Sequence, residues 1–267
     1  MNISTCRLDS CPVVDRKLIV QIDNKNNSCV TAESCPRIEA FRSHWNQIKA
    51  AVSAEGLLCE DTVHLIFNHV DQLIALLISC VKVGDEDDAQ ARSALRQVVG
   101  EERVFDILTT WCVANSSSWK NAIAQQLLKV YETLVSQSAE FVICFRHVFS
   151  SLPYLCQTLL GDATLPRDTE ECVVFLMHQV CTKMVVVTGD HGPPPDRQHN
   201  VFFDLDQGSS SEPSNYISIL KLMVPFLFRE DRVGQLSRDS LLFVLANFSK
   251  IDTVVSYVAD ESNFCPV

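Results

Sequence analysis

Histidine and cysteine are the residue types in this chain that could perform chemistry, and their spacing decides whether they do. His64 and His69 are five residues apart, so on a helix they point in different directions and cannot form the i, i+4 pair of a zinc protease. His178 and Cys181 are three apart and could share a helical face, but two ligands do not make a metal site. We therefore expect a hydrogen-bonded or partly exposed histidine beside a buried thiol at this position.

The cysteines near the N-terminus have no metal-site spacing. Cys6, Cys11, Cys29 and Cys35 are separated more loosely than the ligands of a zinc knuckle. Cysteine precedes proline at Cys11, Cys35 and Cys265, a pair that can ligate haem in some sensors, but axial ligation also needs an enclosing apolar pocket. Neither pattern favours a metal or a cofactor.

The remaining motif search gives no catalytic signature. Asp204 and Asp206 frame a leucine as in a metal-binding DxD, but they lie in a serine-rich loop without phosphate-cradling glycines. No nucleophile elbow, P-loop, dinucleotide-binding glycine fingerprint or kinase signature occurs. The sequence therefore predicts no catalytic, cofactor-binding or metal-binding residues, no cofactor, and a protein that is not an enzyme.

Composition indicates a folded, helical and acidic protein. Of 267 residues, 47% are hydrophobic and 21% charged, which is typical of a globular chain. Eight glycines are about 3% of the chain, less than half of the usual roughly 7%, and this scarcity favours helices joined by short polar turns. A net charge of −11 argues against nucleic acid as a partner and against direct docking on anionic membranes.

Cysteine usage and hydropathy predict a reducing, cytosolic compartment. Twelve cysteines are too few for a disulfide scaffold of this length. Six of them fall within apolar helical patterns and are expected to be small buried hydrophobes: Cys80, Cys112, Cys144, Cys156, Cys172 and Cys181. Residues 1–10 lack the apolar core of a signal peptide. The most apolar stretch, 63–83, carries too many polar residues to predict a membrane span.

Apolar periodicity predicts a succession of helices. The first begins with Ser34 as cap and Pro36 in its first turn, and its apolar residues repeat at 3-4-3-4 spacing: Ile38, Phe41, Trp45, Ile48 and Val52. The helices expected after it cover residues 60–83, 89–99, 101–114, 119–136, 140–160, 170–187, 215–228, 233–248 and 252–260. A break is expected at Gly100 and a break or kink at Pro153.

These elements predict an organisation in four parts. Residues 1–34 form an irregular extension, 35–188 a helical repeat region, 189–214 a loop rich in proline, glycine and serine, and 215–267 further helices. Antiparallel helix pairs in units of roughly 35 to 50 residues predict an all-α fold, an α-solenoid of the armadillo or HEAT kind. A compact orthogonal helix bundle is the alternative.

The last fifty residues carry the most specific motifs. They are LKLMVPFL at 220–227, RVGQLSRDSLL at 232–242 and VSYVADESNFCPV at 255–267. Earlier stretches agree in order: FRSHWN at 41–46, QLLKVYETL at 126–134 and CVVFLMHQVC at 172–181. Residues 36–267 thereby resemble the N-terminal portion of the Hook-interacting protein (FHIP) family, whose members continue for several hundred residues.

The resemblance implies a non-catalytic adaptor in an FTS–Hook–FHIP complex. Its implied partners are a Hook-family protein and the ubiquitin-conjugating-like protein FTS, with a Rab GTPase as a further one. Such a complex connects dynein–dynactin to endosomes and other vesicles, so a cytoplasmic protein, held on vesicles only indirectly, is expected. The alternative is a generic helical-repeat scaffold unrelated to Hook, and a metal or haem sensor ranks third.

The final helices contain more apolar residues than a single inward-facing stripe can bury, including Leu241, Leu242, Phe243 and Val255. A solenoid repeat cannot bury its apolar face alone and leans on the repeat that follows. We therefore expect a solenoid truncated at the C-terminus, with an apolar patch exposed at that end.

Overall fold

The structure is a computed structural model that describes residues 36–54, 58–80, 86–137, 146–188 and 215–248. Within these ranges every regular element is a helix and none is a strand, which confirms the expected all-α class. The elements are α1 (Pro36–Val52), α2 (Glu60–Ser79), α3 (Glu86–Glu101), α4 (Val104–Ala114), α5 (Lys120–Val135), η3 (Arg146–Phe149), α7 (Leu152–Leu160), α8 (Arg167–Thr188), α9 (Asn215–Met223), η4 (Val224–Phe226) and α10 (Arg232–Phe248).

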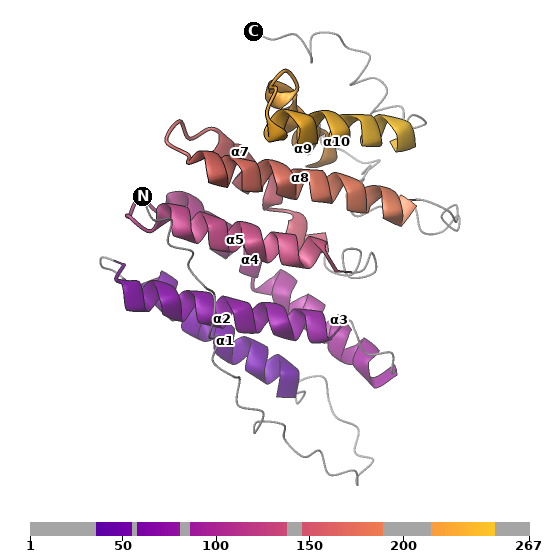
Figure 1. The fold of residues 1–267 in the computed structure, drawn as a ribbon. Helices are drawn as coiled ribbons and strands as arrows, with labels where there is room; N and C mark the ends of the chain where they lie inside the picture. Colours follow the sequence, from indigo (N-terminus) through magenta and orange to yellow (C-terminus); the bar gives the residue numbers. More distant parts are fainter. Residues whose placement is uncertain (1–35, 55–57, 81–85, 138–145, 189–214, 249–267) are drawn as a thin grey trace, which may run out of the picture.

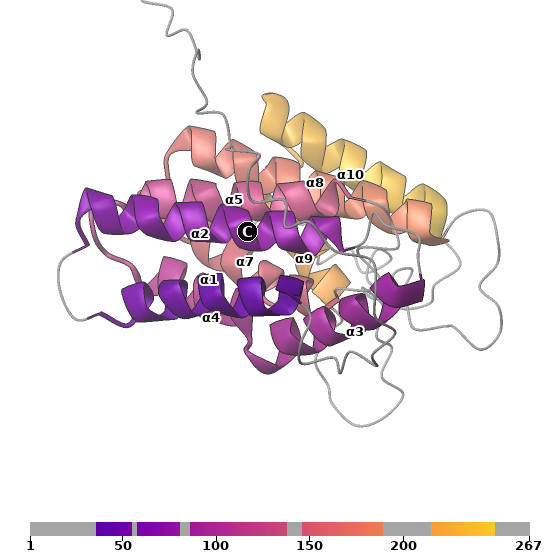
Figure 2. The ribbon, with the colours of Figure 1, turned by 90° about the horizontal axis from the view of Figure 1, so that it is seen from below.

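The helices are stacked in two layers. The front layer of Figure 1 contains α2, α5, α8 and α10 in that order, and each packs on the next. The second layer contains α1, α4, α7 and α9, of which α4 packs on α7 and α7 on α9 (Figure 2). The α3 helix runs beside this layer and contacts α1, α4 and η3. Short connections join α1 to α2, α4 to α5 and α7 to α8, so the two helices of each pair run in opposite directions.

The first helix confirms the expected apolar face. The α1 helix begins at Pro36, and Ile38, Phe41, Trp45 and Ile48 are all buried. Their 3-4-3 spacing places them on the side of α1 that packs on α2, the tightest contact of α1. Burial of large apolar side chains, at about 1.5 to 3 kcal/mol each, is what holds this pair together.

A buried hydroxyl network ties the middle of the stack together. The Tyr131 side chain is fully buried, and its hydroxyl lies 3.3 Å from Thr109 Oγ1 and 3.0 Å from Ser151 Oγ. Its ring lies between Phe105 and Phe149, with centroids 5.7 and 6.4 Å away. Burial raises the pKa of Tyr131 to about 12. Because its hydroxyl is satisfied, this large polar group is accommodated inside the core without an unmet hydrogen bond.

The break between α3 and α4 lies three residues beyond the predicted one. Gly100 is helical, and the chain turns at Arg103, whose φ of 48° is in the left-handed region. The carboxylate of the preceding Glu102 binds Trp45 Nε1 at 3.1 Å and Lys49 Nζ at 2.8 Å on α1. Contacts with α1 therefore fix the position of the turn, and they outweigh the local preference of glycine.

Of the break or kink expected at Pro153, the structure has the break, and Pro153 lies at the start of the helix that follows it. It lies in the first turn of α7, where the missing backbone N–H of proline costs nothing because no acceptor is available there. The predicted helix over 140–160 is replaced, in its described part, by the short 3-10 helix η3 and then α7. Pro225 similarly lies in the 3-10 turn η4 that follows α9. The α2 helix ends at Ser79, before the predicted Val83.

Several expectations fall on residues outside the described ranges. They are the extension 1–34 with its Ser34 cap, the loop 189–214 and the helix over 252–260. Among the described helices, α2 is long and apolar enough to cross a membrane by length and composition alone, a test that a core helix also passes. In this fold its apolar side packs on α1 and α5.

Candidate functional site

The histidines of α2 do not form a site together. The His69 ring faces His44 of α1, with their Nδ1 atoms 2.9 Å apart. The His64 side chain is mostly exposed, and its Nε2 lies 3.6 Å from Glu60 Oε1. The prediction that His64 and His69 point in different directions is confirmed. The close approach of His44 to His69 was not predicted, because it joins two helices.

His178 and Cys181 also have separate environments. His178 Nδ1 lies 2.8 Å from Ser240 Oγ of α10, and burial lowers the pKa of this histidine. Cys181 is fully buried, which raises the pKa of its thiol to about 12. A thiol with this pKa stays protonated near neutral pH and is therefore a poor nucleophile. The expected hydrogen-bonded histidine beside a buried thiol is confirmed.

The cysteines are mostly core residues, with one error in the prediction. Cys80, Cys112 and Cys156 are buried as expected, whereas Cys172 on α8 is exposed. The pKa of Cys172 is raised, first by partial burial and then by the carboxylates of Glu132, Glu171 and Asp168. Periodicity assigned Cys172 to the apolar side because most residues around it are apolar, but it faces outward at the start of α8.

No constellation of metal ligands occurs in the parts of the chain that the structure describes. Nowhere within them do three His, Cys, Asp or Glu side chains come together in a way that could hold an ion. The four N-terminal cysteines, Cys144, Cys265 and the Asp204–Asp206 pair all lie outside the described ranges. The described surface therefore has to be considered for contacts with other molecules.

Ion pairs between α8 and the chain before α10 form one such surface. Arg229 Nη1 lies 2.8 Å from Glu170 Oε2, and the other nitrogens of its guanidinium bind Asp231. Arg167 donates to the same Asp231 carboxylate at 3.0 Å. These contacts, Arg229 foremost, lower the pKa of Asp231 to about 2. Every carboxylate in this cluster is already neutralised by arginine, so the cluster joins helices and offers no free ligand.

The same segment shows why a glycine is needed at 234. A Cβ added to Gly234 would lie 2.0 Å from the Arg229 carbonyl oxygen, so only glycine permits this close approach. The backbone N–H of Gly234 donates to Asp231 Oδ1, which caps α10. Arg238 donates to the Leu227 and Arg229 carbonyls at 2.7 Å each. The motif at 232–242 is thus explained by the start of α10, where Arg238 binds two carbonyl oxygens of the preceding segment.

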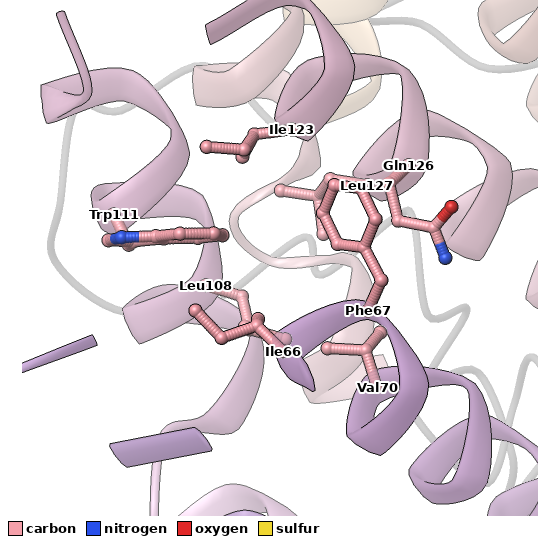
Figure 3. A pocket seen from close by; sticks show the side chains of 8 residues that line it. All are labelled: Ile66, Phe67, Val70, Leu108, Trp111, Ile123, Gln126 and Leu127. Carbon is pink, nitrogen blue, oxygen red and sulfur yellow. The ribbon is translucent and has the colours of Figure 1, made fainter. Parts of the chain in front are cut away.

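The seam between α2 and α5 is partly open. Figure 3 shows the part of this seam that lies toward the N-terminal end of α2, where Phe67 of α2 and Trp111 of α4 face one another across a small hollow. The hollow has a volume of about 20 Å³, room for about one water molecule. Its walls are otherwise aliphatic, apart from Gln126 of α5. Gln126 Nε2 donates to Asp71 Oδ1 of α2 at 2.9 Å and so bridges the seam.

Toward the C-terminal end of α2, beyond that bridge, the seam widens into a groove of about 240 Å³, which we call the α2–α5 groove. Its floor is made of the buried Ile74 and Val130. Asp71, Ala75 and Ile78 form its α2 wall, and Lys129 and Thr133 form its α5 wall. Sequence reasoning missed this groove because its walls come from helices that are far apart in the chain. The family-like stretch 126–134, which supplies the α5 wall, was the only available signal.

Comparisons with known proteins identify the class of protein. A family model described as RAI16-like, retinoic acid induced 16-like protein, matches residues 99–267. The match takes in more than half of the chain, so this chain belongs to that family. No solved structure matches the chain.

Curated relatives carry the FHIP name and confirm the resemblance inferred from the motifs. The FHF complex subunit HOOK-interacting protein 1B of Danio rerio is 27% identical over 250 residues, 90% of this chain. An FHIP family protein of Drosophila virilis is 27% identical over 86% of the chain, and one of Brugia malayi is 24% identical over 96%. These alignments take in only 21%, 23% and 24% of the three relatives, so the chain spans about a fifth to a quarter of their length.

Proposed function

We propose that this protein is a non-catalytic adaptor subunit of an FTS–Hook–FHIP-type complex. The supporting observation is the relative from Danio rerio, which is named as an FHF complex subunit and Hook-interacting protein and aligns over 90% of this chain. A Hook-family protein and FTS are the partners that the proposal implies, and a Rab GTPase is a third. In this role the protein connects dynein–dynactin to endosomes or other vesicles.

The architecture proposed for this role is an α-solenoid. Antiparallel pairs stacked in two layers, each pair leaning on the next, agree with a repeat array. The helical region 35–188 and the region 215–267 then form one continuous stack, since α8 packs on α10 and α7 on α9. The segments 1–34 and 189–214 lie outside the described residues. Extended arrays of this kind offer large surfaces for protein partners.

The proposed location is the cytoplasm, with indirect attachment to vesicles. An acidic chain, with a net charge of −11, is repelled by anionic lipid surfaces. Recruitment through a protein partner avoids that repulsion.

Co-precipitation tests the proposal directly. The full chain, tagged at its N-terminus, is expressed with a Hook-family protein and FTS, and each partner is then precipitated in turn. We expect all three to be recovered together. A core variant such as Phe41→Asp, which should unfold α1, serves as the negative control. Recovery of neither partner by the folded wild-type chain would favour a helical scaffold unrelated to Hook.

A further inference from the structure

We propose that the α2–α5 groove is the docking site for an amphipathic helix of a protein partner, with one basic and one acidic flank. The proposal deepens the adaptor function by naming where on the chain a partner helix lies. It rests on three observations: an open apolar floor, two charges of opposite sign without an ion-pair partner in the described part of the chain, and the presence of direct ion pairs between other parts of the stack.

Elsewhere in the described fold, ion pairs join parts of the stack that are distant in the chain. Lys49 of α1 pairs with Glu102 at the end of α3, and Lys120 of α5 pairs with Asp162, which precedes α8. Arg232 of α10 pairs with Glu171 of α8 at 2.9 Å. In each case a cation and a carboxylate from different elements meet directly.

The α2–α5 groove lacks such a pair although it has both charges. Asp71 stands on one wall and Lys129 on the other. Asp71 accepts a hydrogen bond from the neutral Gln126, and neither Asp71 nor Lys129 has an ion-pair partner in the described part of the chain. The carboxylate and the ammonium therefore remain available to charges brought by another molecule.

The dimensions suit a helix. On α2 the groove extends from Asp71 to Ile78, which at 1.5 Å per residue is about 10 Å, or about two helical turns. The floor of the groove, formed by Ile74 and Val130, is apolar, and the small side chain of Ala75 on the α2 wall leaves this floor accessible. A helix with apolar residues at i, i+3, i+4 and i+7 can place them in such a groove.

The charges define the flanks of the bound helix. A Lys or Arg flank meets Asp71, and an Asp or Glu flank meets Lys129. The negative charge of α2 further favours a basic flank on the side of the partner helix that faces α2, because α2 contains Glu60, Asp61 and Asp71 and no Lys or Arg. Since reversing the direction of a helix exchanges its two flanks, a mixed-flank helix fits in one direction only. The partner is thus oriented as well as bound.

Two kinds of variant test the groove. Ala75→Trp fills it from the rim without removing a core side chain, and Gln72→Trp places the same side chain on the exposed outer face of α2. Asp71→Lys makes both walls basic, whereas Asp61→Lys makes the same charge change away from the groove. Circular dichroism of each full-length variant establishes that it is folded before binding is measured.

The probes are three stapled helical peptides of about 18 residues with one common apolar stripe. The first has a basic and an acidic flank, the second two acidic flanks and the third two basic flanks. Fluorescence anisotropy is measured at about 0.15 M salt, where long-range attraction by the acidic chain is screened. We expect the mixed peptide to bind the wild-type protein and Ala75→Trp to abolish that binding, with Gln72→Trp unchanged. Asp71→Lys should shift preference about fivefold toward the acidic peptide, and Asp61→Lys should not.

Any of three results would overturn the docking proposal: no peptide binds, Ala75→Trp binds as well as Gln72→Trp, or the two charge variants behave alike. The Hook and FTS co-precipitation is repeated with the same variants to keep the two proposals apart. Peptide binding as expected without recovery of Hook would support the groove and contradict the Hook assignment. If Ala75→Trp still recovers Hook and the peptides bind without the expected selectivity, the Hook assignment would be supported and the groove contradicted.

Discussion

At the scale of single residues, Trp45 carries two kinds of contact. Its side chain is 0% exposed in the α1–α2 core, and its indole N–H donates to Glu102 Oε2. Lys49 binds the same oxygen, and its hydrogen bond is the main reason that the pKa of Glu102 is lowered. One side chain thus fills the core and holds the turn between α3 and α4.

Trp45→Ala should lower the free energy of unfolding by roughly 3 to 5 kcal/mol, because it leaves a large cavity in a packed core. Trp45→Phe retains most of the apolar volume but loses the N–H donor, so a smaller loss, near 1 to 2 kcal/mol, is expected. Urea denaturation followed by circular dichroism measures both. A loss below about 1 kcal/mol for Trp45→Ala would contradict a core role for this residue.

Gly234 is a position where backbone packing excludes every side chain. Gly234→Ala should destabilise the protein by roughly 1 to 3 kcal/mol, since the new Cβ would overlap the Arg229 carbonyl and shift the start of α10. Gly161→Ala is the matched control: there the nearest atom to an added Cβ is the Gln157 oxygen at 3.2 Å, and a change within about 1 kcal/mol is expected. Equal shifts in the midpoint of thermal unfolding would show that the α10 start is not closely packed.

At the scale of elements, the pairing of α1 with α2 depends on protonation. A hydrogen bond between His44 and His69 needs one Nδ1 without a proton, so the doubly protonated pair loses it and gains repulsion. The pKa of His44 is lowered, mainly by burial and then by His69. The unfolded chain therefore binds a proton more readily than the folded one between this lowered pKa and the ordinary value of 6.5.

Stability should accordingly be complete above about pH 6.5 and decline as the pH falls toward the lowered pKa of His44. Burial of His178 acts in the same direction. Urea unfolding at several pH values between about 7.5 and 5.5 measures the slope. His44→Gln should flatten it, whereas His64→Gln, which changes a mostly exposed side chain, should leave it unchanged. An identical slope in wild type and His44→Gln would exclude the His44–His69 pair as the cause.

The helices could be predicted from the sequence more readily than their ends. Apolar spacing located α1 and α5 to within a residue at their starts, because each buries one continuous stripe. The end of α3 was misplaced because Trp45 and Lys49 of α1 bind Glu102 in the turn that follows α3. Local sequence patterns do not show such a contact between helices. The α2–α5 groove was missed for the same physical reason: Asp71 and Lys129 acquire meaning only when two helices are placed side by side.

At the scale of the whole molecule, the far end of the stack exposes large apolar side chains. Phe228, after η4, is 68% exposed and Leu242 on α10 is 63% exposed, more than Leu65 or Tyr154 elsewhere on the described surface. In a stack where each pair leans on the next, such residues mark the face that an adjoining pair or a partner would cover. An uncovered apolar face of this kind favours association with other apolar surfaces.

We therefore expect the isolated 267-residue chain to self-associate or to bind a hydrophobic dye. The double variant Phe228→Lys and Leu242→Lys should reduce both, because a charged side chain at each position makes burial against another apolar surface unfavourable. Leu65→Lys, at a half-exposed position on α2, should change neither. Light scattering and dye fluorescence measure the two effects. A monodisperse wild-type protein that does not raise the fluorescence of the dye would contradict an uncovered apolar face at this end of the stack. The α2–α5 groove would then be the remaining candidate for a partner contact.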